Sequence, residues 1–428
     1  MAVSGYFNEL KRKPGLRSAG VYTFTNFFTK GISFLLIPVF TNPRFLTPAD
    51  NGVLSLFSSS VLFLMPFISL GLTQSASTDF FKLGKTDFKD FFTTGFALTI
   101  ATTLLSVAII FLLKDYLHAK YGLPVIFMWI VPAVTFLNFC SEQTTGLIRN
   151  NDQPFRYLGI GITKTATELG IALVLIVAYQ YGWLGRITGM MAALLLVSTY
   201  SLYYFIKNGY LFGKIKMKYV RAELLYAFPI IVMQANMFIL SSSDKFFLAT
   251  DHALLGVYTI ACTFASVIVI FSAALIQYFS PKIFALLSAD KVQYHEIKKL
   301  LLYYIGAMFG SFVLFLFFTA LFYHLFINIK YHEALHYIYF IAAGYFFWTL
   351  ASILYSFFLY YKEKKKIIVH SFLSMAVAIT ANYFFIKRWS AYGAAVAVMV
   401  SYFFVLLITL ISTKKYIMSV FKSSLHDK

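Results

Sequence analysis

Residues 46–56 read LTPADNGVLSL, and residues 250–260 read TDHALLGVYTI. Aligned without a gap, the two segments place Gly52 over Gly256, and a valine follows in both. Each segment leaves one long apolar run and enters the next, which predicts a chain built from two related halves. The alternative explanation is that glycine is common near helix starts in any membrane protein.

The apolar runs around these segments are long enough to cross a bilayer. The chain is 60% hydrophobic and 12% charged, with a mean hydropathy of +0.75, whereas a soluble domain is about half apolar and a quarter charged. Crossing about 30 Å of hydrocarbon takes roughly 20 helical residues. Runs of that length cover residues 21–41, 52–74, 91–113, 123–147, 157–179, 184–206, 224–249, 254–280, 299–327, 334–360, 366–386 and 391–413.

These runs predict an all-α integral membrane protein with twelve transmembrane helices in two pseudo-symmetric six-helix lobes around a central cavity. Six spans, an even number, separate the repeated segments, so both halves have the same orientation in the membrane. The expected organisation is a cytoplasmic N-terminal segment (1–20), an N-lobe (21–206), a cytoplasmic inter-lobe linker (207–222), a C-lobe (223–413) and a cytoplasmic C-terminal tail (414–428).

The distribution of basic residues predicts the orientation. With the N-terminus in the cytoplasm, 26 of the 36 Lys and Arg residues fall on the cytoplasmic side and 7 on the other, with 3 inside spans. The positive-inside rule therefore places both termini in the cytoplasm. Residues 1–20 have no apolar core and no cleavage site, so we expect residues 21–40 to be an uncleaved anchor.

The net charge of +19 does not indicate nucleic-acid binding, because the basic residues lie in short links rather than on one face. Such links suit anionic membrane lipids instead. Cys140 and Cys262 lie inside apolar runs, so neither a disulfide framework nor a cysteine metal site is indicated.

Sequence motifs for catalysis are missing. The chain has no Asp-x-Asp or His-Glu-x-x-His motif, and residues 209–214 are one residue too short for a P-loop. The outer links are about ten residues or shorter, which disfavours a membrane-embedded glycan polymerase, the competing class of protein. We therefore expect a transporter that is not an enzyme and has no cofactor or bound metal.

Charged residues inside the spans are candidate site residues, because an ionisable group in hydrocarbon costs several kcal/mol unless it faces a cavity or a partner. Lys30 lies midway along the first span, on the same face as Asn26. The shared face of Asn26 and Lys30 predicts that the first span lines a water-filled cavity. The alternative is that Lys30 pairs with a neighbouring carboxylate.

Three other spans carry candidates. The fourth span carries a row of polar residues along one side: Asn138, Glu142, Thr145 and Arg149. In the fifth, Lys164 and Glu168 are spaced i, i+4 and can pair with each other. In the seventh, Asp244 and Lys245 lie near the outer end and can simply be hydrated there. The expected substrate or cavity residues are Lys30, Asn26, Glu142, Arg149, Lys164, Glu168, Asp244 and Lys245.

Three stretches carry a resemblance to a known family: KGISFLLIPVF (30–40), LTPADNGVLSL (46–56) and SDKFFLATDHALLGVYTIA (243–261). The chain resembles O-antigen (Wzx-type) polysaccharide flippases of the multidrug/oligosaccharidyl-lipid/polysaccharide exporter superfamily. That family usually has Asp-Arg where this chain has Asp244-Lys245, which keeps the charge and loses the guanidinium fork.

The resemblance implies a protein of the bacterial inner membrane that flips an undecaprenyl-diphosphate-linked oligosaccharide for O-antigen and lipopolysaccharide biosynthesis. It implies alternating access driven by H⁺ or Na⁺, and polysaccharide polymerase or assembly proteins as partners. Two relatives remain alternatives. Lipid II flippases carry two more C-terminal helices, and cation drug exporters prefer an acidic cavity, whereas this chain has Lys30 in its first span.

Overall fold

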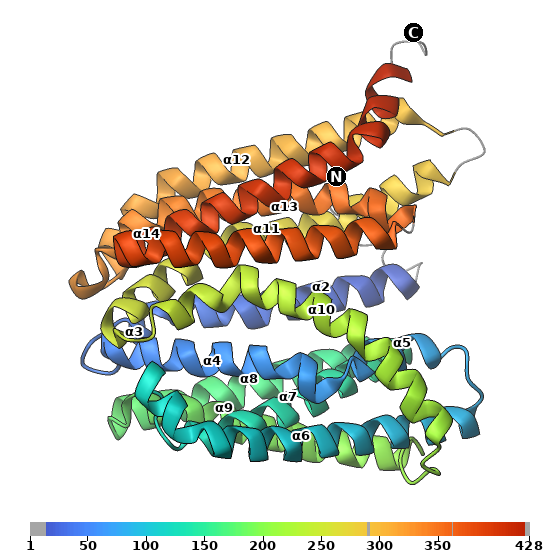
Figure 1. Ribbon diagram of the computed structural model, residues 1–428, viewed down its shortest axis with the longest axis horizontal. Coiled ribbons are helices and arrows are strands. Elements are labelled where there is room, and N and C mark those ends of the chain that lie inside the picture. Colours follow the sequence, from blue (N-terminus) through green and yellow to red (C-terminus); the bar gives the residue numbers. More distant parts are fainter. Residues whose placement is uncertain (1–13, 289–291, 362, 424–428) are drawn as a thin grey trace. The chain divides into compact units, whose positions relative to one another are not determined.

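The structure is a computed structural model that describes residues 14–288, 292–361 and 363–423. These residues form helices joined by short links, and they fall into two compact units (Figure 1). The first unit comprises Met1–Phe40 with Arg44–Ala235, and the second comprises Thr41–Pro43 with Asn236–Lys428. The expected inter-lobe linker, 207–222, thus belongs to the first unit, and the units divide later, within the helix α10 (Met217–Phe247).

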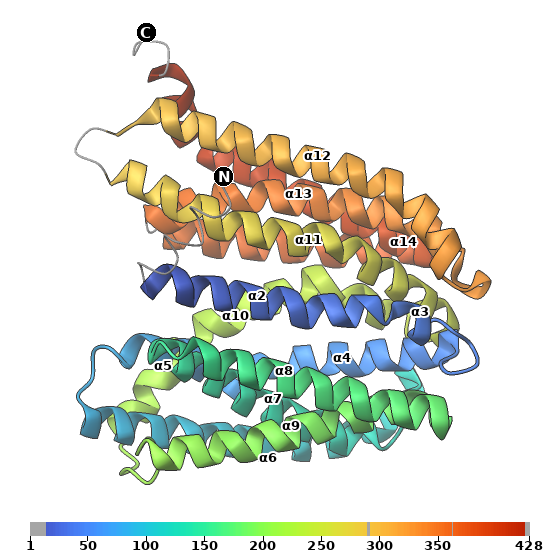
Figure 2. The same ribbon diagram turned by 180° about the vertical axis from the view of Figure 1, so that it is seen from behind.

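In the first unit, six long helices run beside one another with short helices between them (Figures 1 and 2). Its elements are α2 (Pro14–Leu35), α3 (Ile37–Phe40), α4 (Pro48–Ser69), α5 (Leu72–Asp79), α6 (Lys85–Tyr121), α7 (Phe127–Asn150), α8 (Pro154–Leu173), the π-helix η1 (Val174–Ala178), α9 (Gly182–Lys207) and the beginning of α10 (Met217–Phe247).

The second unit contains the remainder of α10 and five further helical elements. They are α11 (His252–Leu287), α12 (Tyr294–Phe326), the 3₁₀-helix η2 (Ile329–Tyr331), α13 (Ala334–Tyr360) and α14 (Lys364–Ser423). The long helices α11 to α14 lie side by side in both views (Figures 1 and 2).

The repeated sequence segments start helices at the same aligned position. Thr47 caps α4 through a capping box, in which its hydroxyl accepts from Asp50 N at 3.2 Å. Asp251 caps α11 by accepting from Leu254 N at 2.9 Å. In the gapless alignment Thr47 falls on Asp251, and both side chains satisfy amides that the first helical turn leaves unpaired.

Several helices have apolar surfaces that the rest of the protein does not bury, as is expected of helices that contact lipid. Of the described residues, nine helical stretches are long and apolar enough to cross a membrane. The apolar windows of α6 and α12 have hydropathies of 2.5 and 2.2 with only 11% of their residues buried. Exposed apolar surface of this extent is not tolerated in water. The protein is therefore an all-α membrane protein.

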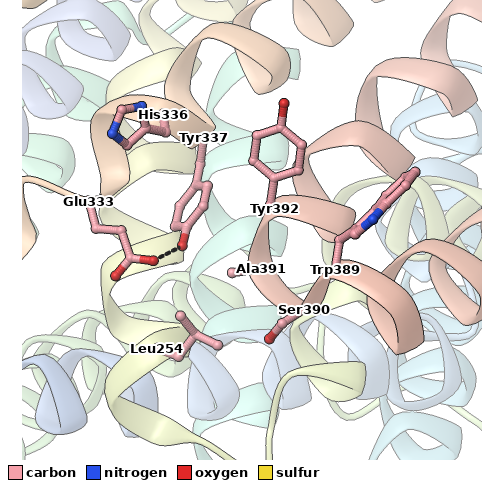
Figure 3. Close-up of a pocket in the computed structure, with 8 residues that line it drawn as sticks. All are labelled: Leu254, Glu333, His336, Tyr337, Trp389, Ser390, Ala391 and Tyr392. Atoms are coloured by element: carbon pink, nitrogen blue, oxygen red, sulfur yellow. Dashed lines mark hydrogen bonds between the residues drawn. The ribbon is translucent and has the colours of Figure 1, made fainter.

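The 60-residue element α14 consists of two helices that meet at Ser390, whose φ of 51° and ψ of −129° are not helical. His370 Nε2 lies 2.8 Å from Ser412 Oγ. These residues stand about equally far before and after the break, so the two parts, 364–389 and 391–423, run antiparallel. Figure 3 shows the break facing the start of α13, with Trp389, Ser390, Ala391 and Tyr392 opposite Glu333, His336 and Tyr337.

Candidate functional site

Two neighbouring helices of the first unit carry half of the predicted site residues. Asn138, Glu142 and Arg149 belong to α7, and Lys164 and Glu168 belong to α8; we call these five the α7–α8 polar row. Lys164 Nζ donates to Asn138 Oδ1 at 3.4 Å. Lys164 also lies within electrostatic reach of both Glu142 and Glu168. The two sequence rows therefore come together across one helix pair.

The sequence spacing allows Glu168 to pair with Lys164. The ion pair that Glu168 forms in the structure is instead with Arg186. Glu168 Oε1 lies 3.2 Å from Arg186 Nη2 on α9, and the side chains are only 22% and 21% exposed. The Arg186 guanidinium also covers the Phe40 ring at 4.7 Å. Its Nη1 is buried with no hydrogen-bond partner among the described residues. The basic-residue count assigns Arg186 to an outer link, whereas its side chain contacts the α7–α8 polar row through Glu168.

Close packing between α8 and α9 makes this pair possible. A Cβ on Gly189 would lie 2.5 Å from the carbonyl oxygen of Glu168, and one on Gly185 would lie 3.0 Å from Leu175 Cβ in η1, which continues α8. Only glycine permits such an approach of backbones. The Gly185 to Gly189 spacing thus brings Arg186, which stands between the two glycines, against α8.

Arg149 stands at the end of the row. Its side chain is exposed in the last turn of α7, and the guanidinium lies 5.9 Å from the centre of the Tyr157 ring on α8. The Tyr157 ring in turn contacts Tyr22 of α2 edge to face at 5.1 Å. Aromatic rings at this distance favour a cation without neutralising it, so Arg149 remains available to an anion.

Asn26 and Lys30 belong to α2, but their side chains lie outside the described part of the structure. The helix itself is placed by a close approach to α8, because a Cβ on Gly161 would lie 2.7 Å from Thr25 Cγ2. The first span therefore runs along the helix that carries Lys164 and Glu168.

Asp244 and Lys245 belong to the second unit. Asp244 is 3% exposed and accepts from the Tyr258 hydroxyl and from Lys245 N, the latter at 2.9 Å. Lys245 is half-buried. The alternative of an Asp244 hydrated at the membrane surface is therefore wrong, because its carboxylate is enclosed by protein.

Sequence periodicity did not identify the polar contacts that hold α10 to α14 in the second unit. Ser374 Oγ donates to Asn236 Oδ1 at 3.2 Å, and Asn382 Nδ2 donates to Ser243 Oγ at 2.9 Å. All four residues are buried. Single uncharged side chains in an apolar run give no periodic signal, so only the packed helices reveal the pairs.

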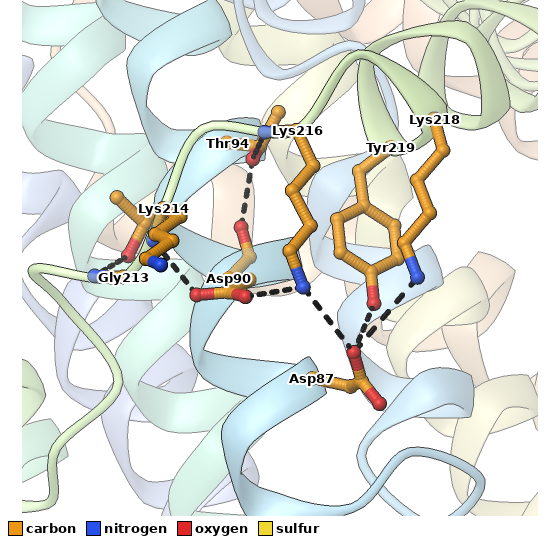
Figure 4. Close-up of polar contacts among 9 residues, drawn as sticks. Asp87, Asp90, Thr94, Gly213, Lys214, Lys216, Lys218 and Tyr219 are labelled. Carbon is orange, nitrogen blue, oxygen red and sulfur yellow. Dashed lines mark hydrogen bonds and ion pairs between the residues drawn. The ribbon is translucent and has the colours of Figure 1, made fainter.

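A second group missed by sequence joins the segment 213–219 to the beginning of α6 (Figure 4). Lys216 Nζ lies 2.6 Å from Asp90 Oδ2 and 3.6 Å from Asp87 Oδ1. Asp90 Oδ1 accepts from Lys214 N at 2.7 Å, and Asp87 Oδ1 accepts from the Tyr219 hydroxyl at 3.0 Å. The hydrogen bond to Asp90 raises the pKa of Lys216. We call these five residues the linker cluster.

The described residues include no group of three or more His, Cys, Asp or Glu side chains that could hold a metal ion. Cys140 is buried and Cys262 is half-buried, and both are free thiols. What the polar row offers is a set of fixed charges within apolar helices, which can hold a charged group during passage through a membrane.

Comparison with known proteins found no matching family model and no matching curated protein. Solved structures do match. The lipid II flippase MurJ in an inward closed conformation has a TM-score of 0.71 at 15% identity, over 92% of this chain and 87% of MurJ. An inward-facing multidrug resistance MATE family transporter of the MOP superfamily has a TM-score of 0.69 at 12% identity, over 89% and 93%.

A mutant of the Vibrio cholerae MATE transporter VcmN also matches, with a TM-score of 0.55 at 13% identity over 95% of this chain and 98% of that one. All three matched proteins are transporters or flippases rather than enzymes. The chain therefore shares its fold with a MATE family transporter of the MOP superfamily and with the lipid II flippase MurJ.

Proposed function

We propose that this protein is a secondary-active flippase that moves an undecaprenyl-diphosphate-linked oligosaccharide from the cytoplasmic to the periplasmic leaflet of a bacterial inner membrane. The oligosaccharide is the repeat unit of an O-antigen or related polysaccharide. Movement occurs by alternating access of two lobes, 21–206 and 223–413, around a central cavity, and a gradient of H⁺ or Na⁺ drives it.

The charge of the α7–α8 polar row with Arg186 carries this proposal. Arg149, Lys164 and Arg186 provide three cations against the two carboxylates of Glu142 and Glu168. A diphosphate carries about two negative charges and loses water on entering a low-dielectric cavity, where fixed cations act far more strongly than in bulk water. A cationic drug would need the opposite sign of charge. The row therefore favours an anionic headgroup as cargo.

Lys30 adds a further cation near the middle of the first span. In the proposed cycle, Arg149 attracts the diphosphate at the cytoplasmic mouth, Lys30 offsets its charge at mid-membrane, and Lys164 or Lys245 receives it as the lobes move. Glu168 keeps Arg186 in place, at 3.2 Å.

The proposed topology has twelve spans with both termini in the cytoplasm. It adds α2 and α7 to the nine apolar stretches and counts α14 as two helices. The loops rich in lysine then face the anionic inner leaflet.

Purified protein in liposomes tests the proposal. We expect it to move an undecaprenyl-diphosphate oligosaccharide without ATP, and faster with a proton or sodium gradient. Lys30→Arg should keep substantial flipping, whereas Lys30→Ala and Lys30→Glu should abolish it in protein that is still inserted and expressed, since the sign of the charge matters more than its shape.

Two results would contradict the proposal. A strict ATP requirement would exclude secondary transport. Export of cationic drugs without movement of the lipid-linked oligosaccharide would identify the protein as a multidrug exporter instead. If Lys30→Ala lowers folded yield and a second change at Glu142 or Glu168 restores it, Lys30 is a structural partner of that carboxylate.

A further inference from the structure

The second unit contains a cavity of about 460 Å³ at the break in α14 (Figure 3). We call it the Trp389 pocket. Its wall combines the start of α11, the start of α13 and the link within α14, which are far apart in sequence. The lining residues are Leu254, Glu333, His336, Tyr337, Trp389, Ser390, Ala391 and Tyr392.

Two aromatic rings are held at this pocket while remaining accessible. Trp389 stacks on Phe385 with ring centres 5.6 Å apart, and Tyr392 meets Phe340 edge to face at 5.0 Å. Even so, Trp389 is 45% exposed and Tyr392 is 41% exposed. The Arg388 guanidinium also lies 5.5 Å from the centre of the Trp389 ring. Both aromatic rings are therefore held by neighbours and still offer surface to a ligand.

The backbone that positions these rings is strained. Ser390 has a φ of 51° and a ψ of −129°, a conformation that residues with a Cβ rarely adopt. A glycine would adopt it at lower cost, yet the chain has a serine whose hydroxyl lies at the pocket (Figure 3). Strain of this kind in a non-glycine residue is concentrated at ligand sites.

The opposite wall is polar. Glu333 Oε1 accepts the hydroxyl hydrogen of Tyr337, and His336 lies one helical residue before that tyrosine (Figure 3). A carboxylate has room for about four hydrogen bonds, so Glu333 can accept more than this one. The adjoining cavity of about 370 Å³ shares Leu254 and Ser390 and adds Asp251 and Lys387.

We propose that the Trp389 pocket binds a distal sugar residue of the lipid-linked oligosaccharide, one that is not attached directly to the diphosphate, an inference that rests on the proposed function. A hexose ring has C–H faces that pack on aromatic rings and hydroxyl edges that donate to a carboxylate. The pocket offers both, from Trp389 and Tyr392 on one side and Glu333 on the other. The Glu333 carboxylate disfavours an anion, so the pocket suits the glycan rather than the diphosphate.

The position of the pocket along the chain gives it a role. Its three contributing segments are the links after the seventh, ninth and eleventh predicted spans, which lie on the lysine-poor, expected periplasmic side. The pocket therefore receives the glycan at the end of translocation, while the diphosphate still interacts with cations within the membrane.

The test compares two cargoes in proteoliposomes: undecaprenyl diphosphate bearing the complete repeat oligosaccharide, and undecaprenyl diphosphate bearing one sugar. We expect Trp389→Ala and Glu333→Gln to slow the oligosaccharide cargo about tenfold, as a loss of 1.4 kcal/mol does, and to leave the single-sugar cargo unchanged. Trp389→Phe should be intermediate. Trp129→Ala, which removes a tryptophan 51% exposed in the first unit, should slow neither.

The single-sugar cargo also reports on folding, because a damaged protein moves both cargoes slowly. Equal slowing of both by Trp389→Ala and Glu333→Gln would overturn the proposal and identify these residues as structural or as membrane-interface anchors. Unchanged rates for both cargoes would also overturn it. Wild-type protein that moves neither cargo would instead refute the proposed flippase function, and the pocket proposal with it.

Discussion

Arg186 of α9 forms an ion pair with Glu168 of the α7–α8 polar row. Their ion pair measures 3.2 Å, and each side chain is less than a quarter exposed. Removing one member of an enclosed pair leaves the other charge desolvated without compensation, whereas removing both removes the cost as well. The pair is therefore sensitive to single substitutions and tolerant of a double one.

We expect Arg186→Ala to lower the stability of the purified protein by roughly 2 kcal/mol, less than a fully buried pair loses because some water still reaches this one. Thermal unfolding in detergent measures the change. Arg186→Ala combined with Glu168→Ala should recover most of the loss. A double variant as unstable as the sum of the two single ones would show that the residues do not interact.

The helical spacing of Asn138, Glu142 and Arg149 was sufficient to predict that they share a face, and the structure places Lys164 of α8 beside Asn138. The partner of Glu168 was not predictable in the same way. The i, i+4 rule concerns neighbours on one helix, whereas Arg186 comes from α9. Its approach depends on glycine packing between two helices, which local spacing does not report.

At the scale of helices, the turn between the two parts of α14 depends on one glycine, Gly393. A Cβ on Gly393 would lie 2.0 Å from the carbonyl oxygen of Phe385 and 2.9 Å from Ile386 N. Those atoms are backbone, so they cannot rotate away as a side chain can. The tight antiparallel turn between 364–389 and 391–423 therefore requires glycine here.

We expect Gly393→Ala to destabilise the protein by about 3 kcal/mol or more, because overpacking against backbone forces the two helices apart. Gly306→Ala on α12 is the matched control, since a Cβ there meets nothing within 4 Å and alanine favours a helix. Folded yield and melting temperature of the two variants decide the matter. Equal folded yields and melting temperatures of the two variants would contradict the requirement for glycine at position 393.

Hydropathy predicted the existence of the long helices better than their ends. The third predicted span covers 91–113, whereas α6 extends over Lys85–Tyr121. Its extra turn before residue 91 carries Asp87 and Asp90, which bind the segment 213–219 through Lys216. Charged turns beyond the hydrocarbon carry no hydropathy signal, and their contacts depend on a segment more than a hundred residues later in the chain.

At the scale of the whole molecule, the repeat predicts two related halves, and the structure contains two compact units that divide within α10. The expected linker, 207–222, lies in the first unit because the linker cluster ties it to α6. Farther along, Glu223 Oε1 accepts from the Ser75 hydroxyl at 2.8 Å in the same unit. The expected linker and the start of α10 are therefore held to the first unit by polar contacts, which the spacing of apolar runs does not report.

The orientation of the molecule in the membrane is testable with two single cysteines. We predict that Asp115→Cys reacts with a membrane-impermeant maleimide from the periplasm, and that Ile215→Cys reacts only after the inner membrane is opened. Both positions are exposed, so a lack of labelling reflects the side of the membrane rather than burial in the protein. Cys140→Ala and Cys262→Ala remove the two native thiols.

The expectation follows from the 26 basic residues counted on one side against 7 on the other, because positive loops are retained in the cytoplasm. The residues lie on opposite ends of an odd number of predicted spans, namely the fourth, fifth and sixth. Labelling of both from the same side would therefore require one of these three helices not to cross the membrane, and would exclude the twelve-span topology with it.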